Sequence, residues 1–176
     1  MKKIIGLFFA VLFSAGLYAQ EGVIKFLGIP VDGTKQAVIQ KLKSKGFTYD
    51  QQDDLLEGEF NGENVSIKVQ TINNKVWRIY VGDLVYRRKG QIKIRFNNLV
   101  AQFEKNSKYT PIKESQTIDE NEDIEYEISV HDKQYEAAFL SETGGFVWFM
   151  IARKTGGYVI AMYYESPKNK ADGSDL

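Results

Sequence analysis

The stretch LLEGEFNGENVSIKVQTINNKVWRIYVG, residues 55–82, decides the fold. Asn61-Gly62 and Asn73-Asn74 are residue pairs that accept the positive φ angles of tight hairpin turns. Between residues 65 and 70, apolar and polar side chains alternate, which indicates a strand with one buried and one solvated face. An antiparallel meander is therefore predicted, with strands at Leu55 to Phe60, Glu63 to Thr71 and Lys75 to Gly82.

A helix is predicted before this meander. The segment GIPVDGT, residues 28–34, is typical of a turn that leads into a helix, with Asp32 or Thr34 as the N-cap. The helix is expected to end at Lys45, because Gly46 stands where a left-handed C-cap belongs. Its apolar stripe consists of Ala37, Val38, Ile39 and Leu42. A short strand-like lead, Val23 to Leu27, precedes the turn.

The same order recurs in the second half of the chain. A helix is predicted at about Gly90 to Lys105, where five apolar residues stand at helical spacing: Ile92, Phe96, Leu99, Val100 and Phe103. Predicted strands follow at about Asp123 to His131, Gln134 to Ser141, Phe146 to Arg153 and Tyr158 to Glu165. The turns between them are Asp132-Lys133, Gly144-Gly145 and Gly156-Gly157.

This order predicts an α+β domain over residues 20–165. We expect two tandem helix-plus-meander units, about 22–84 and 85–165, that form one curved antiparallel sheet with both helices packed on its convex face. Val76-Trp77 in the third predicted strand of the first unit and Val147-Trp148 in the third of the second suggest a diverged internal duplication.

The two ends of the chain have compositions of their own. Residues 1–19 combine two lysines, a short apolar run and a small-residue exit, which predicts a secretory signal peptide cleaved after Ala19. The alternative is an uncleaved N-terminal anchor. The apolar run is shorter than the ~20 residues of a spanning helix, so the mature chain is expected not to span a membrane. Residues 166–176 lack apolar content and are predicted to be disordered. The predicted signal peptide implies a periplasmic or secreted location.

Composition excludes several classes of function. The chain has no cysteine, so it forms no disulfide, no thiolate metal site and no acylated lipoprotein anchor. Without Lys2 and Lys3, the chain carries 21 basic and 23 acidic residues, whereas nucleic-acid binding needs a basic excess. We therefore expect no nucleic-acid partner, no metal and no cofactor.

Three patterns could carry chemistry, and each has a plainer interpretation. His131 beside Asp132 resembles an acid-base pair but stands at a predicted hairpin end. The run Asp119 to Asp123 begins like a calcium loop but lacks the glycine and the glutamate that such loops need. Glu125 and Glu127, on one face of a predicted strand, would place two carboxyl groups roughly 6 to 7 Å apart, as in glycosidases. No catalytic residue is predicted.

Aromatic content on both faces of the last two strands is the unusual feature of the sequence. Such strands are usually covered on both sides, but two helices can cover only one face of so large a sheet. Exposed aromatic patches often mark interaction sites. The candidate partner-binding residues are Trp77, Tyr80, Trp148 and Tyr163. The alternative is that helices or a folded connection bury them.

The helix-plus-meander repeat, the signal peptide and the segment from Gly28 to Thr34 resemble small secreted proteins of Bacteroidetes whose fold is similar to β-lactamase inhibitor protein. The related small outer-membrane assembly lipoproteins look similar too. In the inhibitor family the concave sheet face grips a partner protein. The resemblance implies the same use for the face that bears Trp77 and Trp148, and it transfers no individual contact residue.

These observations favour an exported binding module that holds a protein or peptide on the concave face of its sheet, without catalysis. A first alternative is a carrier or sensor of an apolar or glycan ligand. A second is a carbohydrate-active hydrolase that uses Glu125 and Glu127.

Overall fold

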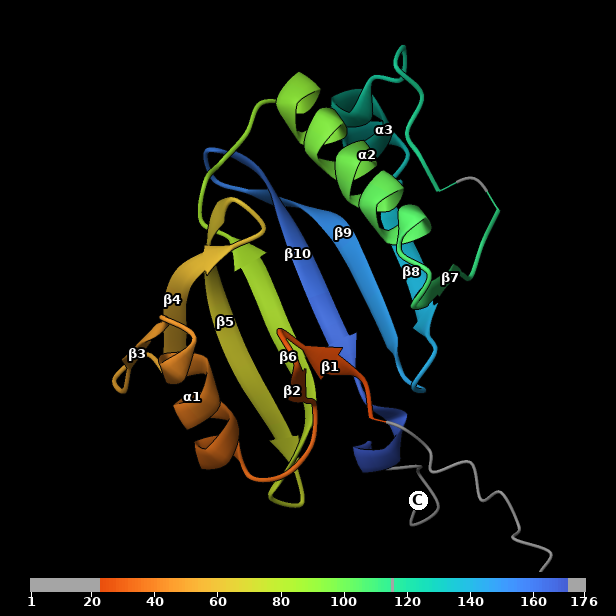
Figure 1. The fold of residues 1–176 in the computed structure, drawn as a ribbon. Helices are drawn as coiled ribbons and strands as arrows, with labels where there is room; N and C mark the ends of the chain where they lie inside the picture. Colours follow the sequence, from red (N-terminus) through yellow and green to blue (C-terminus); the bar gives the residue numbers. More distant parts are fainter. Residues whose placement is uncertain (1–22, 115, 171–176) are drawn as a thin grey trace, which may run out of the picture.

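The computed structural model describes residues 23–114 and 116–170, so the predicted signal peptide lies outside the described residues. Its centre is an antiparallel sheet of eight strands in the order β3-β4-β5-β6-β10-β9-β8-β7 (Figure 1). The strands of this sheet are β3 (Thr48–Asp50), β4 (Leu55–Phe60), β5 (Glu63–Ile72), β6 (Lys75–Asp83), β7 (Tyr109–Pro111), β8 (Glu136–Ser141), β9 (Phe146–Lys154) and β10 (Gly157–Glu165). The predicted α+β class with a large antiparallel sheet is confirmed.

Two four-stranded meanders meet at the middle of the sheet. In each meander the last strand lies innermost, and β6 pairs with β10 over five residues, from Gly82 opposite Ala161 to Arg78 opposite Glu165. Trp77 lies in the last strand of its meander and Trp148 in the penultimate strand of the other. The two Val-Trp pairs therefore do not occupy equivalent strands, and this support for an internal duplication was wrong.

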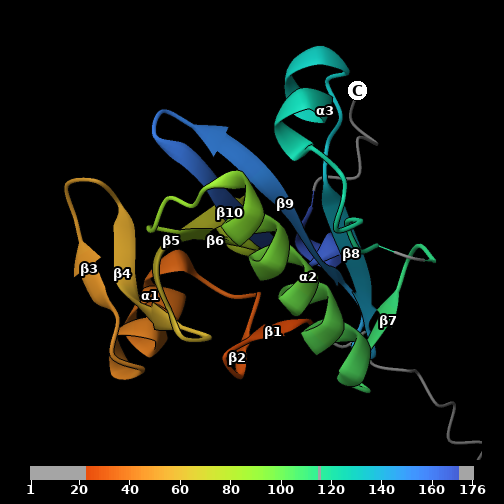
Figure 2. The same cartoon turned by 90° about the horizontal axis from the view of Figure 1, so that it is seen from above.

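Both predicted helices pack against the same face of the sheet (Figure 2). They are α1 (Lys35–Ser44) and α2 (Lys89–Lys105). The Thr34 hydroxyl caps α1 by accepting a hydrogen bond from the Ala37 backbone at 3.3 Å, and Gly46 beyond its end has a φ of +99°. The termini of α1 therefore form as predicted.

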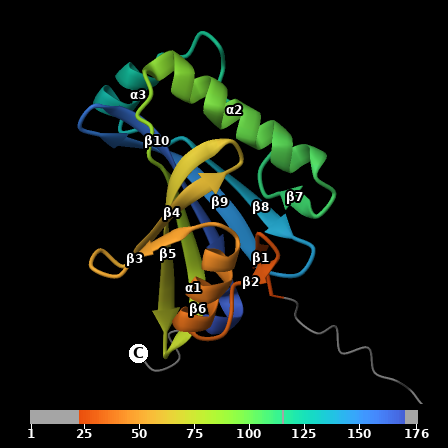
Figure 3. The same ribbon diagram turned by 60° about the vertical axis from the view of Figure 1, so that its left-hand side comes forward.

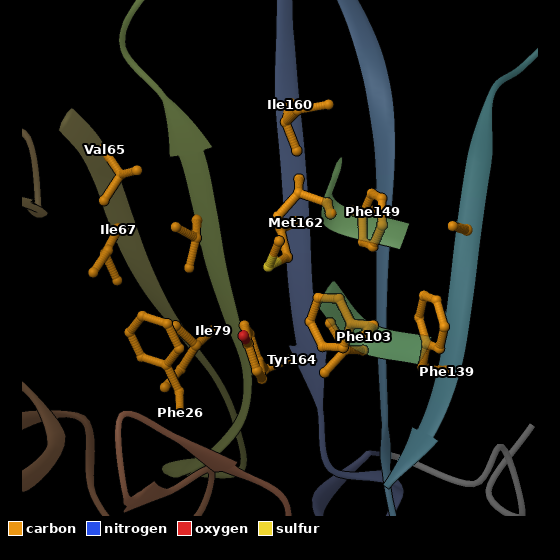
Figure 4. Packing of buried hydrophobic residues seen from close by; sticks show 14 of the residues in the cluster. Phe26, Val65, Ile67, Ile79, Phe103, Phe139, Phe149, Ile160, Met162 and Tyr164 are labelled. Carbon is orange, nitrogen blue, oxygen red and sulfur yellow. The ribbon is translucent and has the colours of Figure 1, made fainter. Parts of the chain in front are cut away.

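The five predicted apolar residues of α2 are all buried against the second meander. The Phe96 ring packs edge-on against Phe149, with the centroids 5.2 Å apart, and the Phe103 ring is stacked with Phe139 at 5.0 Å (Figure 4). Each fully buried side chain of this size contributes about 1.5 to 3 kcal/mol to folding. The buried side chains of both halves belong to one core cluster, which makes the described chain a single packed unit.

A small hairpin fills the space between the two helices (Figures 1 and 3). It consists of β1 (Lys25–Phe26) and β2 (Ile29–Pro30). The hairpin turns tightly at Leu27 and Gly28, both with positive φ. It places the Phe26 ring 5.0 Å from Phe60 and 4.9 Å from Tyr164. The hairpin thereby extends the core across the middle of the sheet.

The strand predicted at Asp123 to His131 is wrong, because this segment forms the helix α3 (Ile124–Val130). Asp123 caps the helix by accepting hydrogen bonds from the backbone of residues 125 and 126, and acidic residues in the first turn suit the helix dipole. Ile124 and Ile128 stand one helical turn apart and pack against the core. Their spacing fits both a strand and a helix, and the cap decides between them. The predicted hairpin at Asp132-Lys133 is therefore a helix-to-strand connection.

The C-terminal segment is ordered further than predicted. Residues Pro167–Asn169 form a short 3₁₀ helix, and the Asn169 side chain donates hydrogen bonds to Asp32 Oδ1 at 2.7 Å and to the Val76 carbonyl at 2.9 Å. The expectation of disorder from residue 166 is thus wrong for residues 166–170, because polar side chains can be held by hydrogen bonds without apolar burial. Residues 171–176 lie outside the described part.

None of the helices within the described residues is long and apolar enough to cross a membrane.

Candidate functional site

The candidate site lies on the side of the sheet that faces away from α1 and α2, which we call the distal face. Ile79, Tyr164 and Val147 point into the core beneath the helices and are buried. Because successive side chains of a strand point to opposite faces, their neighbours Tyr80, Tyr163 and Trp148 lie on the distal face. Three strands thus present one aromatic residue each.

These three residues, which we call the aromatic row, stand side by side across the sheet. Tyr163 on β10 is directly opposite Tyr80 on β6 and Trp148 on β9. The rings of Trp148 and Tyr163 are stacked at 4.1 Å with 15° between their planes, and the Tyr80 ring lies 5.3 Å from that of Tyr163. Aromatic pairs of this kind contribute about 0.5 to 1.5 kcal/mol beyond their burial. All three side chains remain partly exposed.

Gly82 has no side chain and so leaves room for the Tyr80 side chain. A Cβ atom at Gly82, two residues further along β6, would lie 2.2 Å from the Tyr80 hydroxyl oxygen. Burial raises the pKa of Tyr80, and Tyr163 and Asp83 raise it further. The Tyr80 hydroxyl therefore stays protonated near neutral pH and can donate a hydrogen bond.

The fourth predicted residue, Trp77, lies at an irregularity beside the aromatic row. Arg78 pairs with Gln70 of β5, but the next paired residue of β6 is Val76, so Trp77 is the extra residue of a bulge. The guanidinium of Arg78 lies 4.1 Å from the Trp77 ring centroid and 5.2 Å from that of Tyr163. Arg78 thereby connects Trp77 to the aromatic row.

Glu165 holds this arrangement from the adjacent cross-strand position. Its side chain is only 4% exposed, and its carboxylate accepts a hydrogen bond from Trp148 Nε1 at 2.8 Å. The same carboxylate oxygen pairs with Arg78 Nη2 at 2.5 Å. A buried carboxylate is stable only when it has such partners. Arg78 and Glu165 are not among the residues predicted from the sequence, although a charged residue within an otherwise apolar strand is a visible signal.

A hollow adjoins the aromatic row on the side of β8. Ala138 lies directly opposite Trp148, and its small side chain leaves a cavity of about 210 Å³. Ile112 and Phe146 line it as well. Ile112 is 55% exposed and Leu140, which lies opposite Phe146, is 51% exposed. The apolar surface thus continues from the aromatic row to the edge of the sheet.

Helix α3 borders a second hollow. A cavity of about 520 Å³ lies between α3 and β9, lined by Ile128, Met150 and Ala152 among others. Figure 2 shows α3 beyond β8 and β9, apart from α1 and α2. The distal face therefore has a raised border at one end.

The residues of the predicted hydrolase alternative stand on α3 and not on a strand. Residues two apart on a helix do not face each other, so the shared face assumed for Glu125 and Glu127 is absent. Glu127 lies 3.0 Å from Nδ1 of His131, and His131 is exposed at the end of the helix. His131 therefore pairs with Glu127 rather than with Asp132.

The acidic run before α3 is held by hydrogen bonds and ion pairs. Asp119 accepts a hydrogen bond from the Asn121 backbone at 2.8 Å, and Glu122 pairs with Lys133 and with the Tyr135 hydroxyl. Within residues 23–114 and 116–170, no group of three or more side chains is arranged to hold a metal ion.

Fold and site together define a class: an α+β protein whose antiparallel sheet carries helices on one face and a fixed aromatic row on the other. Comparisons with protein-family models, with curated protein sequences and with solved structures find no match to this chain. Its function must therefore be argued from the site itself.

Proposed function

We propose that the distal face binds a protein or peptide partner and that the protein acts as a binding module without catalysis. The observation that supports this most directly is the aromatic row, three partly exposed rings from three strands held in register. Tryptophan, tyrosine and arginine are the residues that most often dominate binding energy at protein interfaces. Trp77, Arg78 and Trp148 belong to that group.

The contacts around Glu165 favour tight binding, because they fix the rings before a partner arrives. A side chain that is already immobile loses little conformational entropy on binding. The stacking of Trp148 on Tyr163 and the bond from Trp148 to Glu165 both restrict the tryptophan. The hollow above Ala138 can receive an apolar side chain of the partner.

The proposed function requires that the protein meet its partner in a particular compartment. The composition of residues 1–19 supports export, so we propose that the protein meets its partner in the periplasm or outside the cell. Gripping a partner protein on the concave face of the sheet is the binding mode implied by the resemblance to small secreted proteins of Bacteroidetes whose fold is similar to β-lactamase inhibitor protein.

The proposal can be tested with peptides selected from a displayed library against the full chain. We expect Trp148→Ala to weaken the binding of the selected peptides at least tenfold by titration calorimetry, because a central aromatic anchor is removed. Leu140→Asp should also weaken binding, and this exposed position can accept a charge without unfolding.

Tyr86→Ala is the matched control, since Tyr86 is an exposed aromatic residue outside the sheet. Peptides that bind Trp148→Ala and Leu140→Asp as tightly as the unmodified protein would contradict the proposal. Trp148-dependent binding of glycans but of no peptide would instead favour the carrier alternative.

A further inference from the structure

A second candidate site lies on the opposite side of the sheet from the aromatic row. A cavity of about 290 Å³ opens between the β1–β2 hairpin, α2 and the turn after β4. Its apolar and aromatic lining consists of Leu27, Phe60, Leu99, Phe103, Tyr109, Met162 and Tyr164. Figure 4 shows Phe103, Met162 and Tyr164 in one group within the core. The cavity is therefore part of the core that remains open to solvent.

Two tyrosines line this cavity, and Tyr164 is the more deeply buried of them. The residue is 5% exposed and belongs to the cavity lining. Burial raises the pKa of Tyr164, and the nearby Tyr109 raises it further, so the hydroxyl remains a hydrogen-bond donor. Buried polar groups normally have a hydrogen-bond partner, so a hydroxyl in an apolar cavity lining suits a ligand with a hydrogen-bond acceptor.

The rim of the cavity is polar but uncharged. Asn61 in the turn after β4 donates a hydrogen bond to Gln102 Oε1 of α2 at 2.8 Å, and Asn106 lies nearby on the rim. Among the residues that the structure describes, no lysine, arginine, aspartate or glutamate lines the cavity. A charged ligand would lose its hydration without gaining an ion pair, which is costly. The lining thus selects for a neutral molecule.

We propose that this cavity binds a small neutral molecule with an apolar body and one carbonyl or ether oxygen, which accepts a hydrogen bond from Tyr164. An apolar cavity of about 150 Å³ holds benzene, so this larger cavity suits a ligand with roughly ten non-hydrogen atoms. The site is independent of the partner-binding function proposed for the distal face.

The two methionines beyond the predicted signal peptide allow a direct test. Met162 lines the cavity, whereas Met150 lies beside the hollow near α3. With ¹³C-methyl methionine, nonan-2-one is expected to shift the Met162 signal and to leave the Met150 signal in place. The matched hydrocarbon 2-methyl-1-nonene, which carries CH₂ in place of the oxygen, is the second probe.

Tyr164→Phe is expected to weaken binding of the ketone about fivefold, because one neutral hydrogen bond is lost, and to leave the affinity for the hydrocarbon unchanged. Tyr126→Phe, at an exposed tyrosine of α3 that does not line the cavity, is the control and should change neither affinity. Gln102→Trp at the exposed rim should weaken both probes by closing the entrance.

The proposal is overturned if the ketone leaves Met162 unshifted up to its solubility limit, if it shifts Met150 alone, or if Tyr164→Phe affects both probes equally. These outcomes leave the distal-face proposal untouched, since that proposal depends on Trp148 and on peptides.

Discussion

Glu165 is a single residue whose replacement affects both stability and the proposed site. It is nearly fully buried, and its carboxylate serves Arg78 and Trp148 together. Removing the charge from one member of a buried pair is destabilising, because the other charge remains without a partner. The site and the fold therefore depend on the same ion pair.

We expect Glu165→Gln to lower the free energy of unfolding by about 2 to 3 kcal/mol, since Arg78 is left largely buried and unpaired. Urea unfolding followed by tryptophan fluorescence measures the change. The control is Glu136→Gln, which removes an exposed ion pair with Lys113 and should cost less than about 0.5 kcal/mol. Similar losses of unfolding free energy in the two variants would show that the Glu165–Arg78 ion pair stabilises the fold no more than an exposed ion pair does.

At the scale of elements, α3 depends on a polar anchor at its N-terminal side. Glu122 accepts a hydrogen bond from the Tyr135 hydroxyl at 2.7 Å and pairs with Lys133. The bonds from Lys133 and Tyr135 hold the pKa of Glu122 below its ordinary value despite the opposing effect of burial. The acidic run before α3 is thereby fastened to the start of β8.

Because the folded-state pKa of the Glu122 carboxyl is lowered, the sign of the pH dependence of folding stability is determined. The stabilisation by Glu122 is present above the unfolded-state pKa of about 4.3 and is lost as the pH falls through the lower folded-state pKa. Glu122→Gln should therefore cost about 0.5 to 1 kcal/mol near pH 7 and little near pH 2.5. Urea denaturation at both pH values checks this. A loss of equal size at both would contradict the role given to the charge.

Sequence patterns predict some elements of this fold well and others poorly. The two long helices and the hairpins after Phe60 and Ile72 follow from local signals: apolar spacing, a threonine cap and asparagine turns. The strands β3 and β7 are short and polar at the sheet edge, so their sequences carry little alternation. Helix α3 was predicted as a strand because Ile124, Tyr126, Ile128 and Val130 alternate with polar residues. In the helix only Ile124 and Ile128 pack against the core, whereas Tyr126 and Val130 are exposed.

In the candidate site, too, local sequence patterns predict some features and leave others undetermined. Alternation along β9 and β10 was sufficient to place Trp148 and Tyr163 on one face. The pairing of β6 with β10 joins residues far apart in the chain, and no local pattern specifies that Glu165 meets Arg78 there. Long-range register, rather than the choice of face, is what the sequence left undetermined.

The whole molecule is expected to unfold in one step. Both meanders share a core, and the ion pair of Asp83 with Arg95 connects β6 to α2. Ile67→Val in the first meander and Ile160→Val in the second remove one methylene each from buried positions. Each should lower stability by about 1 kcal/mol and the melting temperature by about 2 to 4 °C.

Differential scanning calorimetry of both variants tests this cooperativity. We expect one transition in each, with equal calorimetric and van't Hoff enthalpies. Two transitions, or a variant that shifts only part of the signal, would mean that the meanders unfold separately.

The shortness of the two outermost strands affects how this protein behaves at high concentration. The edge strands β3 and β7 contribute three residues each, and Pro111 in β7 has no N–H to donate. Long flat edges recruit further strands and seed fibrils, whereas short or proline-bearing edges offer few free backbone groups. The long inner strands are thereby shielded from polymerisation. A protein of this design can stay dispersed while an aromatic surface remains accessible on its sheet.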